Sequence, residues 1–148
     1  MHLPVTFRCA ILAIALLGCS LPRHALAINE CKKHDKSFEI FLSKFEEDMV
    51  FQRSRIVMPL VSREGNYFTT DPKIELLDID AIEKLANPLI LSKKEMKSQN
   101  VQDYIIIKTD AFAELLQDQY ESDANRVLFT FRNIDGCWYL EEMHDESM

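Results

Sequence analysis

Glycine is scarce in this sequence, with three Gly among 148 residues. Beyond residue 27 only Gly65 and Gly136 remain, which excludes the glycine-rich loops that hold phosphate groups. The G-x-S-x-G pattern of a nucleophile elbow is also missing, as are H-E-x-x-H and C-x-x-C. The sequence therefore carries none of the common short motifs for nucleotide binding, acyl transfer or zinc chemistry.

Candidate catalytic and metal-ligating side chains are equally few. His34 and His144 lie in polar sequence, and neither has a partner at ligand spacing. The acidic run Glu75-x-x-Asp78-x-Asp80 lacks the glycine and the closing glutamate of a calcium loop. We therefore predict no catalytic residue, no metal and no cofactor, and we expect a protein that is not an enzyme.

The N-terminus predicts export. Arg8 precedes an uncharged run over residues 9–18, which is shorter than the about 20 apolar residues that span a bilayer. The run leads to Ala25-Leu26-Ala27, a small-x-small cleavage pattern. Residues 1–27 are thus predicted to be a signal peptide, and residues 28–148 a single domain in the periplasm or cell envelope.

A second processing route stays open. Leu16-Leu17-Gly18-Cys19 resembles a bacterial lipoprotein signal, in which residues 1–18 are removed and Cys19 is lipidated. The product would be an envelope lipoprotein, for example on the outer membrane.

Removing residues 1–27 makes the chain strongly acidic. Arg8 and Arg23 leave with this segment, so 15 basic residues face 24 acidic ones and the formal charge becomes −9. This balance disfavours contact with phosphate, so we predict no nucleic-acid partner and no membrane contact except through a lipid anchor. A basic protein partner would associate faster, and homodimerisation is left open.

The mature chain keeps Cys31 and Cys137, apart from Cys19. In an oxidising compartment two such thiols are expected to pair. The disulfide would close a loop of roughly 100 residues, for which chain entropy predicts about 4.7 kcal/mol of stabilisation.

Hydrophobic spacing predicts one long amphipathic helix from Asp35 to about Val50. Its apolar positions follow an i, i+3, i+4, i+7, i+11 pattern, and Asp35 or Ser37 can cap its start. Glu46 falls on the polar face. The apolar stripe, which we expect to face the core, is Phe38, Phe41, Leu42, Phe45 and Met49.

Shorter elements follow in the middle of the chain. Residues 55–61 predict a strand in which Pro59 indicates an edge or a bulge, with a polar turn over 62–66. Asp80 is expected to cap a short helix over 81–86.

Two more segments precede the C-terminal strands. Residues 104–108 are rich in β-branched side chains and predict a strand. Asp110 is expected to cap a second amphipathic helical segment, in which Phe112, Leu115 and Leu116 share a face.

A hairpin is predicted at the C-terminal end. Residues 126–134 and 137–143 flank Asp135-Gly136, which favours a type I′ turn. The turn pairs Ile134 with Cys137. It also pairs Asn133 with Trp138, Phe131 with Leu140 and Phe129 with Glu142, leaving the apolar side chains of both strands on one face.

These elements predict an α+β domain in which an N-terminal amphipathic helix packs against a bent antiparallel sheet. This architecture looks like the cystatin-like and nuclear-transport-factor-2-like (NTF2-like) cones.

One segment also resembles a known family. The pattern Phe41-x-x-x-Phe45-x-x-Asp48-x-x-Phe51-Gln52-x-x-Arg55-Ile56-x-x-Pro59-Leu60 is similar to an uncharacterised bacterial envelope family, domain of unknown function 4348. Gly136-Cys137-Trp138-Tyr139-Leu140 matches its C-terminal strand. The resemblance implies a cone-like α+β domain without established catalytic residues. From their own chemistry, Gln52 and Arg55 are expected to fix the helix-to-strand corner by bonding free carbonyls or Asp48.

Export, acidity and the lack of catalytic motifs favour a binding module. Our first hypothesis is a periplasmic immunity or inhibitor protein that neutralises a toxin effector. The alternative is a small-molecule-binding protein or pocket enzyme that uses the interior of the cone. The acidic residues that we expect to contact a protein partner are Asp71, Glu75, Asp78, Asp80 and Glu83.

Overall fold

One six-stranded sheet organises the described part of the chain, which in this computed structural model comprises residues 31, 33–65, 70–85, 88–122 and 124–147. The sheet has the strand order β2-β1-β6-β5-β4-β3. The strands are β1 (Ile56–Glu64), β2 (Lys73–Leu77), β3 (Val101–Lys108), β4 (Phe112–Gln119), β5 (Arg126–Ile134) and β6 (Cys137–Asp145). The helices are α2 (Phe38–Glu47), α3 (Met49–Ser54), α4 (Ile79–Lys84) and α5 (Lys93–Gln99).

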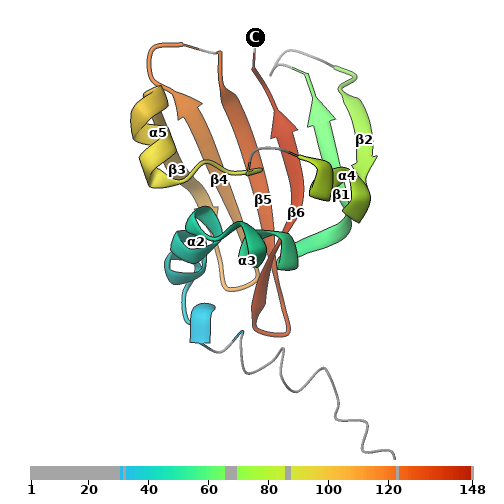
Figure 1. Cartoon of the computed structure of the whole chain (residues 1–148), viewed down its shortest axis with the longest axis vertical. Coiled ribbons are helices and arrows are strands. Elements are labelled where there is room, and N and C mark those ends of the chain that lie inside the picture. Colours follow the sequence, from blue (N-terminus) through green and yellow to red (C-terminus); the bar gives the residue numbers. More distant parts are fainter. Residues whose placement is uncertain (1–30, 32, 66–69, 86–87, 123, 148) are drawn as a thin grey trace, which may run out of the picture.

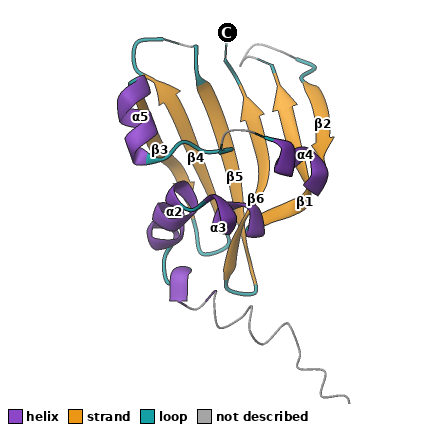
Figure 2. Cartoon of the chain, viewed as in Figure 1, coloured by secondary structure: helices purple, strands orange, loops and turns teal. Residues whose placement is uncertain are grey.

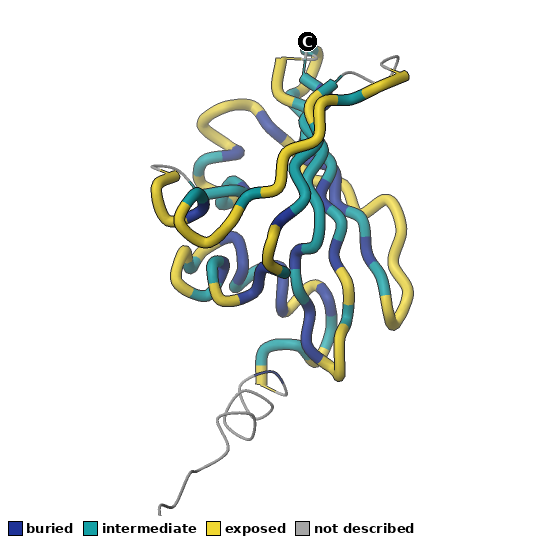
Figure 3. Tube along the Cα trace, turned by 90° about the vertical axis from the view of Figure 1, so that its right-hand side faces the viewer, coloured by how far each residue is buried: buried dark blue, intermediate teal, exposed yellow. Residues whose placement is uncertain are grey.

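All four helices lie on the same side of the sheet (Figures 1 and 2). The view turned by 90° shows them as a separate layer beside the strands (Figure 3). This arrangement confirms the predicted α+β class. Every neighbouring pair of strands is antiparallel except β1 and β6, which run parallel.

The predicted export signal over residues 1–27 and the alternative lipidation site Cys19 lie outside the described residues. Within the described part, no helix combines the length and the apolar character that crossing a bilayer requires.

The predicted N-terminal helix is divided into two. Ser37 caps α2 by accepting the N–H of Ile40, as one of the two expected caps. Asp48 then adopts an extended conformation, which ends α2, and its carboxylate accepts the N–H groups of Val50 and Phe51 to start α3. A single helix to Val50 was therefore wrong, because Asp48 is a good N-cap as well as a helix residue.

The aromatic stripe of α2 packs on the sheet as predicted. Met49, the last position of the predicted stripe, does not, because it begins α3 and is 38% exposed. Phe131 of β5 lies 5.2 Å from Phe38, 5.8 Å from Phe41 and 5.5 Å from Phe45 between ring centroids. Trp138 of β6 lies 5.0 Å from Phe38. Because edge-to-face contacts of this kind add to simple area burial, this cluster is the centre of the core.

The C-terminal hairpin is confirmed around its turn. Asp135 and Gly136 both have positive φ, 54° and 84°, as a type I′ turn requires. The register matches the prediction from the pair Ile134 and Cys137 up to the pair of Phe131 with Leu140. Beyond that point a bulge shifts the register, so Phe129 pairs with Met143 and not with Glu142 as predicted. Strand β6 also continues to Asp145.

The segment after Asp110 forms strand β4 and not a helix. Alternate residues of β4 face the core, where Ala113 and Leu115 are fully buried, and Gln117 is buried on the same side. An apolar spacing that fits one helical face also fits a strand over so few residues. Pairing with β3 on one side and β5 on the other decides the conformation.

The remaining predictions are refined. Pro59 lies in an internal strand, next to β6, where the β1–β6 register shifts between Ile56 and Val61, so the bulge and not the edge is correct. Strand β1 runs on to Glu64, where a turn was predicted from residue 62. Helix α4 is capped by Asp78 and not by Asp80.

Two elements were missed, namely strand β2 and helix α5. The sequence signal for α5 was present, because Ser92 and Glu95 form a capping box at its start.

Candidate functional site

The start of the described chain is fastened to the C-terminal hairpin. Cys31 and Cys137 form a disulfide across a sequence separation of 106 residues, and both are buried. Cys137 is the first residue of β6, directly after the turn. The predicted pairing is thus present.

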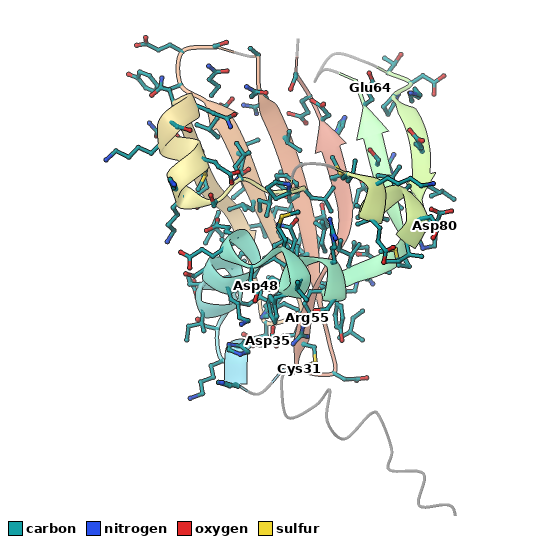
Figure 4. All side chains as sticks on the ribbon, viewed as in Figure 1. Cys31, Asp35, Asp48, Arg55, Glu64 and Asp80 are labelled. Carbon is teal, nitrogen blue, oxygen red and sulfur yellow. A yellow bond between two sulfur atoms is a disulfide. The ribbon has the colours of Figure 1, made fainter. Side chains whose placement is uncertain are left out.

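A buried ion pair lies beside this disulfide. Arg55 Nη2 donates to Asp35 Oδ2 over 3.0 Å, and the side chains are 6% and 0% exposed. The backbone N–H of Trp138 donates to the other oxygen of Asp35 over 3.2 Å, and Arg55 Nη1 lies 3.1 Å from Cys31 Sγ. Figure 4 shows Cys31, Asp35 and Arg55 close together at one end of the molecule. We call these residues, with Cys137, the disulfide corner.

Two rings enclose the guanidinium. The centre of the Arg55 guanidinium lies 5.1 Å from the Phe51 ring centroid and 5.4 Å from that of Tyr139. Arg55 therefore holds the end of α3 to β6 through ionic and aromatic contacts. The predicted partners of Arg55, which were free carbonyls or Asp48, were wrong, because its guanidinium pairs with Asp35 and Asp48 caps α3.

Gln52 fixes the same turn of chain, as predicted. Its Nε2 donates to the carbonyl of Phe45 over 3.1 Å, and its Oε1 accepts the N–H of Leu89 over 2.9 Å. The buried amide of Gln52 thus connects α2 and α3 to Leu89, in the segment that leads into α5. This role is structural.

The disulfide corner also contains three side chains of types that can bind a metal ion. Atoms of Cys31, Asp35 and Cys137 lie within 4.8 Å of one another. Because both sulfurs are bound to each other, neither is a thiolate that could ligate a metal. The carboxylate is already occupied by Arg55 and Trp138. These three side chains therefore do not form a free metal-binding site.

Glu46 is a buried acid of a different kind. Its side chain lies on the face of α2 that was predicted to be polar, yet the residue is 4% exposed, and neither carboxylate oxygen has a hydrogen-bond partner. Burial raises the pKa of Glu46 to about 7, with a further contribution from Asp103 on β3, while Lys93 opposes the shift. Pro88 and Ser92, which precede α5, line a cavity of about 360 Å³ together with Glu46.

The five predicted contact acids are exposed and close in sequence. Asp71 precedes β2, Glu75 lies in β2, and Glu83 lies in α4. Asp78 caps α4 by accepting the N–H of Ala81 over 2.8 Å. Figure 4 places Asp80 at the outer side of α4, beside the edge strand β2. We call residues 71–83 the β2–α4 edge.

Apolar side chains interleave with these acids. Ile74, Leu76 and Ile79 are 45% to 62% exposed. Strand β2 ends the sheet and has β1 as its neighbour on one side, so its other backbone edge has no strand partner among the described residues. Exposed apolar groups beside unpaired strand backbone are a common basis of peptide and protein recognition.

The interior offers little room for a ligand. The space between α2 and the sheet is filled by large side chains that are at most 2% exposed, including Phe38, Phe41, Phe45, Phe129 and Phe131. A hollow of about 840 Å³ lies on the outer surface of α2 and α3 between Glu39 and Val50. Ligand sites are usually concave and enclosed, whereas this hollow faces solvent.

The fold of this chain is similar to the folds of several solved proteins. A solved NTF2-like protein from Bacteroides fragilis NCTC 9343 matches with a TM-score of 0.52 and 18% sequence identity, over 76% of this chain and 48% of that one. This chain therefore spans about half the length of that protein. A cystatin-like protein from Bacteroides caccae ATCC 43185 matches with a TM-score of 0.49 and 20% identity, over 74% of this chain and 75% of that one.

The likeness to the Bacteroides fragilis protein shows the class of fold, which is NTF2-like α+β. An NTF2-like protein of unknown function from Shewanella baltica OS155 also matches, with 16% identity and a TM-score of 0.37 over 82% of this chain and 91% of that one. No family model matches the sequence. No curated protein matches it either.

Proposed function

We propose that this protein is an exported, non-enzymatic binding module that recognises another protein through the β2–α4 edge. The observation that carries the proposal is the open strand β2, where exposed Ile74 and Leu76 alternate with the exposed acid Glu75. A partner segment could pair with the backbone of β2 while its side chains contact both kinds of group.

Charge gives this surface a preferred partner. The five acids of the β2–α4 edge are among the 24 acidic residues behind the formal charge of −9 predicted for residues 28–148. A basic partner segment would be attracted before contact, which raises the association rate more than the final affinity. The favoured partner is therefore a protein with a basic and partly apolar binding segment.

The proposed biological setting is the bacterial periplasm or cell envelope. A small domain that is exported and tied by a disulfide suits an immunity or inhibitor protein that neutralises a toxin effector there. We further propose that the chain belongs to domain of unknown function 4348. The contacts of Gln52 and Arg55 at the corner after α2 explain physically why these two residues belong to the sequence pattern that resembles this family.

The binding test compares two charge-reversal variants. Glu75→Lys/Asp80→Lys reverses two charges of the β2–α4 edge, and the control Asp110→Lys reverses one exposed acid in the β3–β4 connection. Each protein, produced from residue 28, is used to capture partners from the envelope of its own cell. We expect the edge variant to bind the captured partner about tenfold more weakly, with a smaller salt dependence. Equal binding by all three proteins would contradict the assignment of the surface.

A cellular test addresses the immunity role. A strain that lacks the gene is expected to become sensitive to attack by sibling cells that carry the toxin. The wild-type gene and the Asp110→Lys variant should restore resistance, and the Glu75→Lys/Asp80→Lys variant should not. Unchanged resistance of the deleted strain would remove the toxin proposal but leave protein binding open.

Glu46 favours one second candidate, a small-molecule-binding protein or pocket enzyme. Its buried carboxyl has no hydrogen-bond partner and borders the cavity at α5. A ligand that donates a hydrogen bond to Glu46 should raise the melting temperature of the wild type and not of Glu46→Leu, which has no acceptor. A small-molecule screen in which no compound separates the two proteins would count against this candidate.

A further inference from the structure

The second edge of the sheet, strand β3, differs in composition from β2. It presents four large apolar side chains in a row, from Tyr104 to Ile107, each between 42% and 51% exposed. Strand β3 has β4 as its neighbour, and its other backbone edge has no strand partner in the described part of the chain. A monomer rarely leaves such a run on an open edge, because it invites pairing with another chain.

Charged residues bracket this apolar run. Asp103 lies directly before it and Lys108 directly after it. Lys108 pairs with Glu39 of α2 and remains 45% exposed, so it keeps donors for a second acceptor. We call residues 103–108 the β3 edge.

A bulge in β3 places both charges on the same face of the sheet. Asp103 pairs with Gln117, whereas Lys108 pairs with Ala113, and both of these β4 residues face the helical side. Residues five apart on a regular strand would point to opposite faces. The extra residue Ile106, which has no partner on β4, corrects this mismatch.

We propose that two copies of this chain associate through the β3 edge as an antiparallel, two-fold symmetric pair of strands. In the register that centres the axis between Ile105 and Ile106, Asp103 of each copy lies opposite Lys108 of the other. Tyr104 then lies opposite Ile107, and these two residues share the outer face, since they pair with Leu116 and Glu114 of β4. The β3 edge is thus complementary to a second copy of itself: opposite charges meet, and paired side chains lie on the same face of the sheet. An isologous interface requires this self-complementarity.

The two-fold dimer would extend the sheet from six strands to twelve and cover the apolar run of both copies. It would leave the β2–α4 edges at the far ends of the extended sheet. The inference is therefore independent of the proposed protein partner and predicts a bivalent molecule if both hold.

Charge reversal tests both the interface and its register. The disulfide-bonded chain from residue 28 is examined by sedimentation velocity, up to about 1 mM protein and near physiological salt. We expect the wild type to form a dimer. Asp103→Lys and Lys108→Asp each place like charges opposite one another twice per dimer and should raise the dimer dissociation constant about tenfold or more.

The double variant distinguishes the proposed register from a general loss of folding. Asp103→Lys/Lys108→Asp restores opposite charges at both contacts and should dimerise about as well as the wild type. Asp110→Lys, just beyond the β3 edge, serves as the control and should dimerise normally. A wild type that stays monomeric at the highest concentration overturns the proposal. So does a double variant that keeps the wild-type circular dichroism spectrum but does not recover the dimer.

Discussion

Asp35 and Glu46 are two buried acids in the helical layer, and the protein treats them in opposite ways. Burial raises the pKa of both. Asp35 has Arg55 on one oxygen and the N–H of Trp138 on the other, and both oppose the effect of burial. Glu46 has no hydrogen-bond partner, and Asp103 adds to the rise of its pKa.

The difference shows what a buried charge needs in order to be structural. Asp35 connects α3, β6 and the disulfide, so its loss would leave a buried cation unpaired. Glu46 forms no hydrogen bond to another element. Its ionised form therefore destabilises the folded protein at pH values above the ordinary pKa of the acid. Four experiments can test this contrast, beginning with the largest expected effect.

The disulfide closes the corner that contains Asp35 and lies away from Glu46. Cys31→Ser/Cys137→Ser is expected to lower the free energy of unfolding by about 4.7 kcal/mol, because the closed loop holds roughly 100 residues. Urea denaturation of the variant and the wild type at pH 7 measures the difference. Thiol titration of the denatured, unreduced wild type should find no free Cys31 or Cys137, and one equivalent would contradict the pairing.

Removing the charge of Asp35 leaves Arg55 buried without its counter-ion, which costs about 3–5 kcal/mol. The raised pKa of Asp35 shows that removing its buried carboxylate offsets part of this cost, so the net loss should be smaller. Asp35→Asn keeps an oxygen for the N–H of Trp138, so the measured loss reports the ion pair. Urea denaturation at pH 7 gives the loss. The double variant Asp35→Asn/Arg55→Met should lose clearly less than the sum of the single variants, whereas additive losses would show that the two groups are not coupled.

Removing the charge of Glu46 should have the opposite sign. The pKa of Glu46 is about 7 in the folded protein and 4.5 ordinarily, so the unfolded chain releases its proton first as the pH rises. Stability from the protonated carboxyl is full below pH 4.5 and falls by about 3 kcal/mol as the pH rises through 7. At pH 8, Glu46→Gln is therefore expected to be about 3 kcal/mol more stable than the wild type.

Denaturation curves of both proteins between pH 4 and pH 8 would check this. The difference between them should be near zero at the acidic end and grow towards pH 7, since other carboxylates titrate equally in both. A constant difference over this range would show that Glu46 does not titrate as a buried acid.

Asp48 provides the exposed comparison and the smallest effect. Its pKa is lowered, chiefly by the N–H of Phe51, so its stabilisation is present above the ordinary pKa of 3.8 and is lost as the pH falls through the folded value. Asp48→Ala should cost about 1 kcal/mol at pH 7, as other N-caps do. Thermal unfolding at pH 7 and pH 2 would measure this, and an equal loss at both would speak against a carboxylate cap.

Prediction from the sequence succeeded best where the signal was local. The type I′ turn at Asp135-Gly136 sets the register of the hairpin next to it, and it holds up to Phe131. The predicted register fails at Phe129, because a bulge beyond Phe131 places an extra residue in β6, and the turn does not specify that bulge.

The candidate site was predicted only in part. The exposed acids of the β2–α4 edge were identified from their density in the sequence, but strand β2 and its apolar neighbours were not. Glu46 was assigned to the polar face of a helix, because nothing in residues 35–50 indicates that tertiary packing buries it or that residues some 40 positions later line the same cavity.

The sequence by itself determined the hairpin turn and the aromatic face of α2, which are specified by residues close together in the chain. It also determined the disulfide, because Cys31 and Cys137 are the two cysteines left in the predicted domain of residues 28–148. Tertiary structure alone decided that residues 112–119 form a strand, that Arg55 pairs with Asp35, and that β1 runs parallel to β6. The physical reason is that each of these depends on a neighbour distant in sequence. Only the folded chain brings that neighbour into contact.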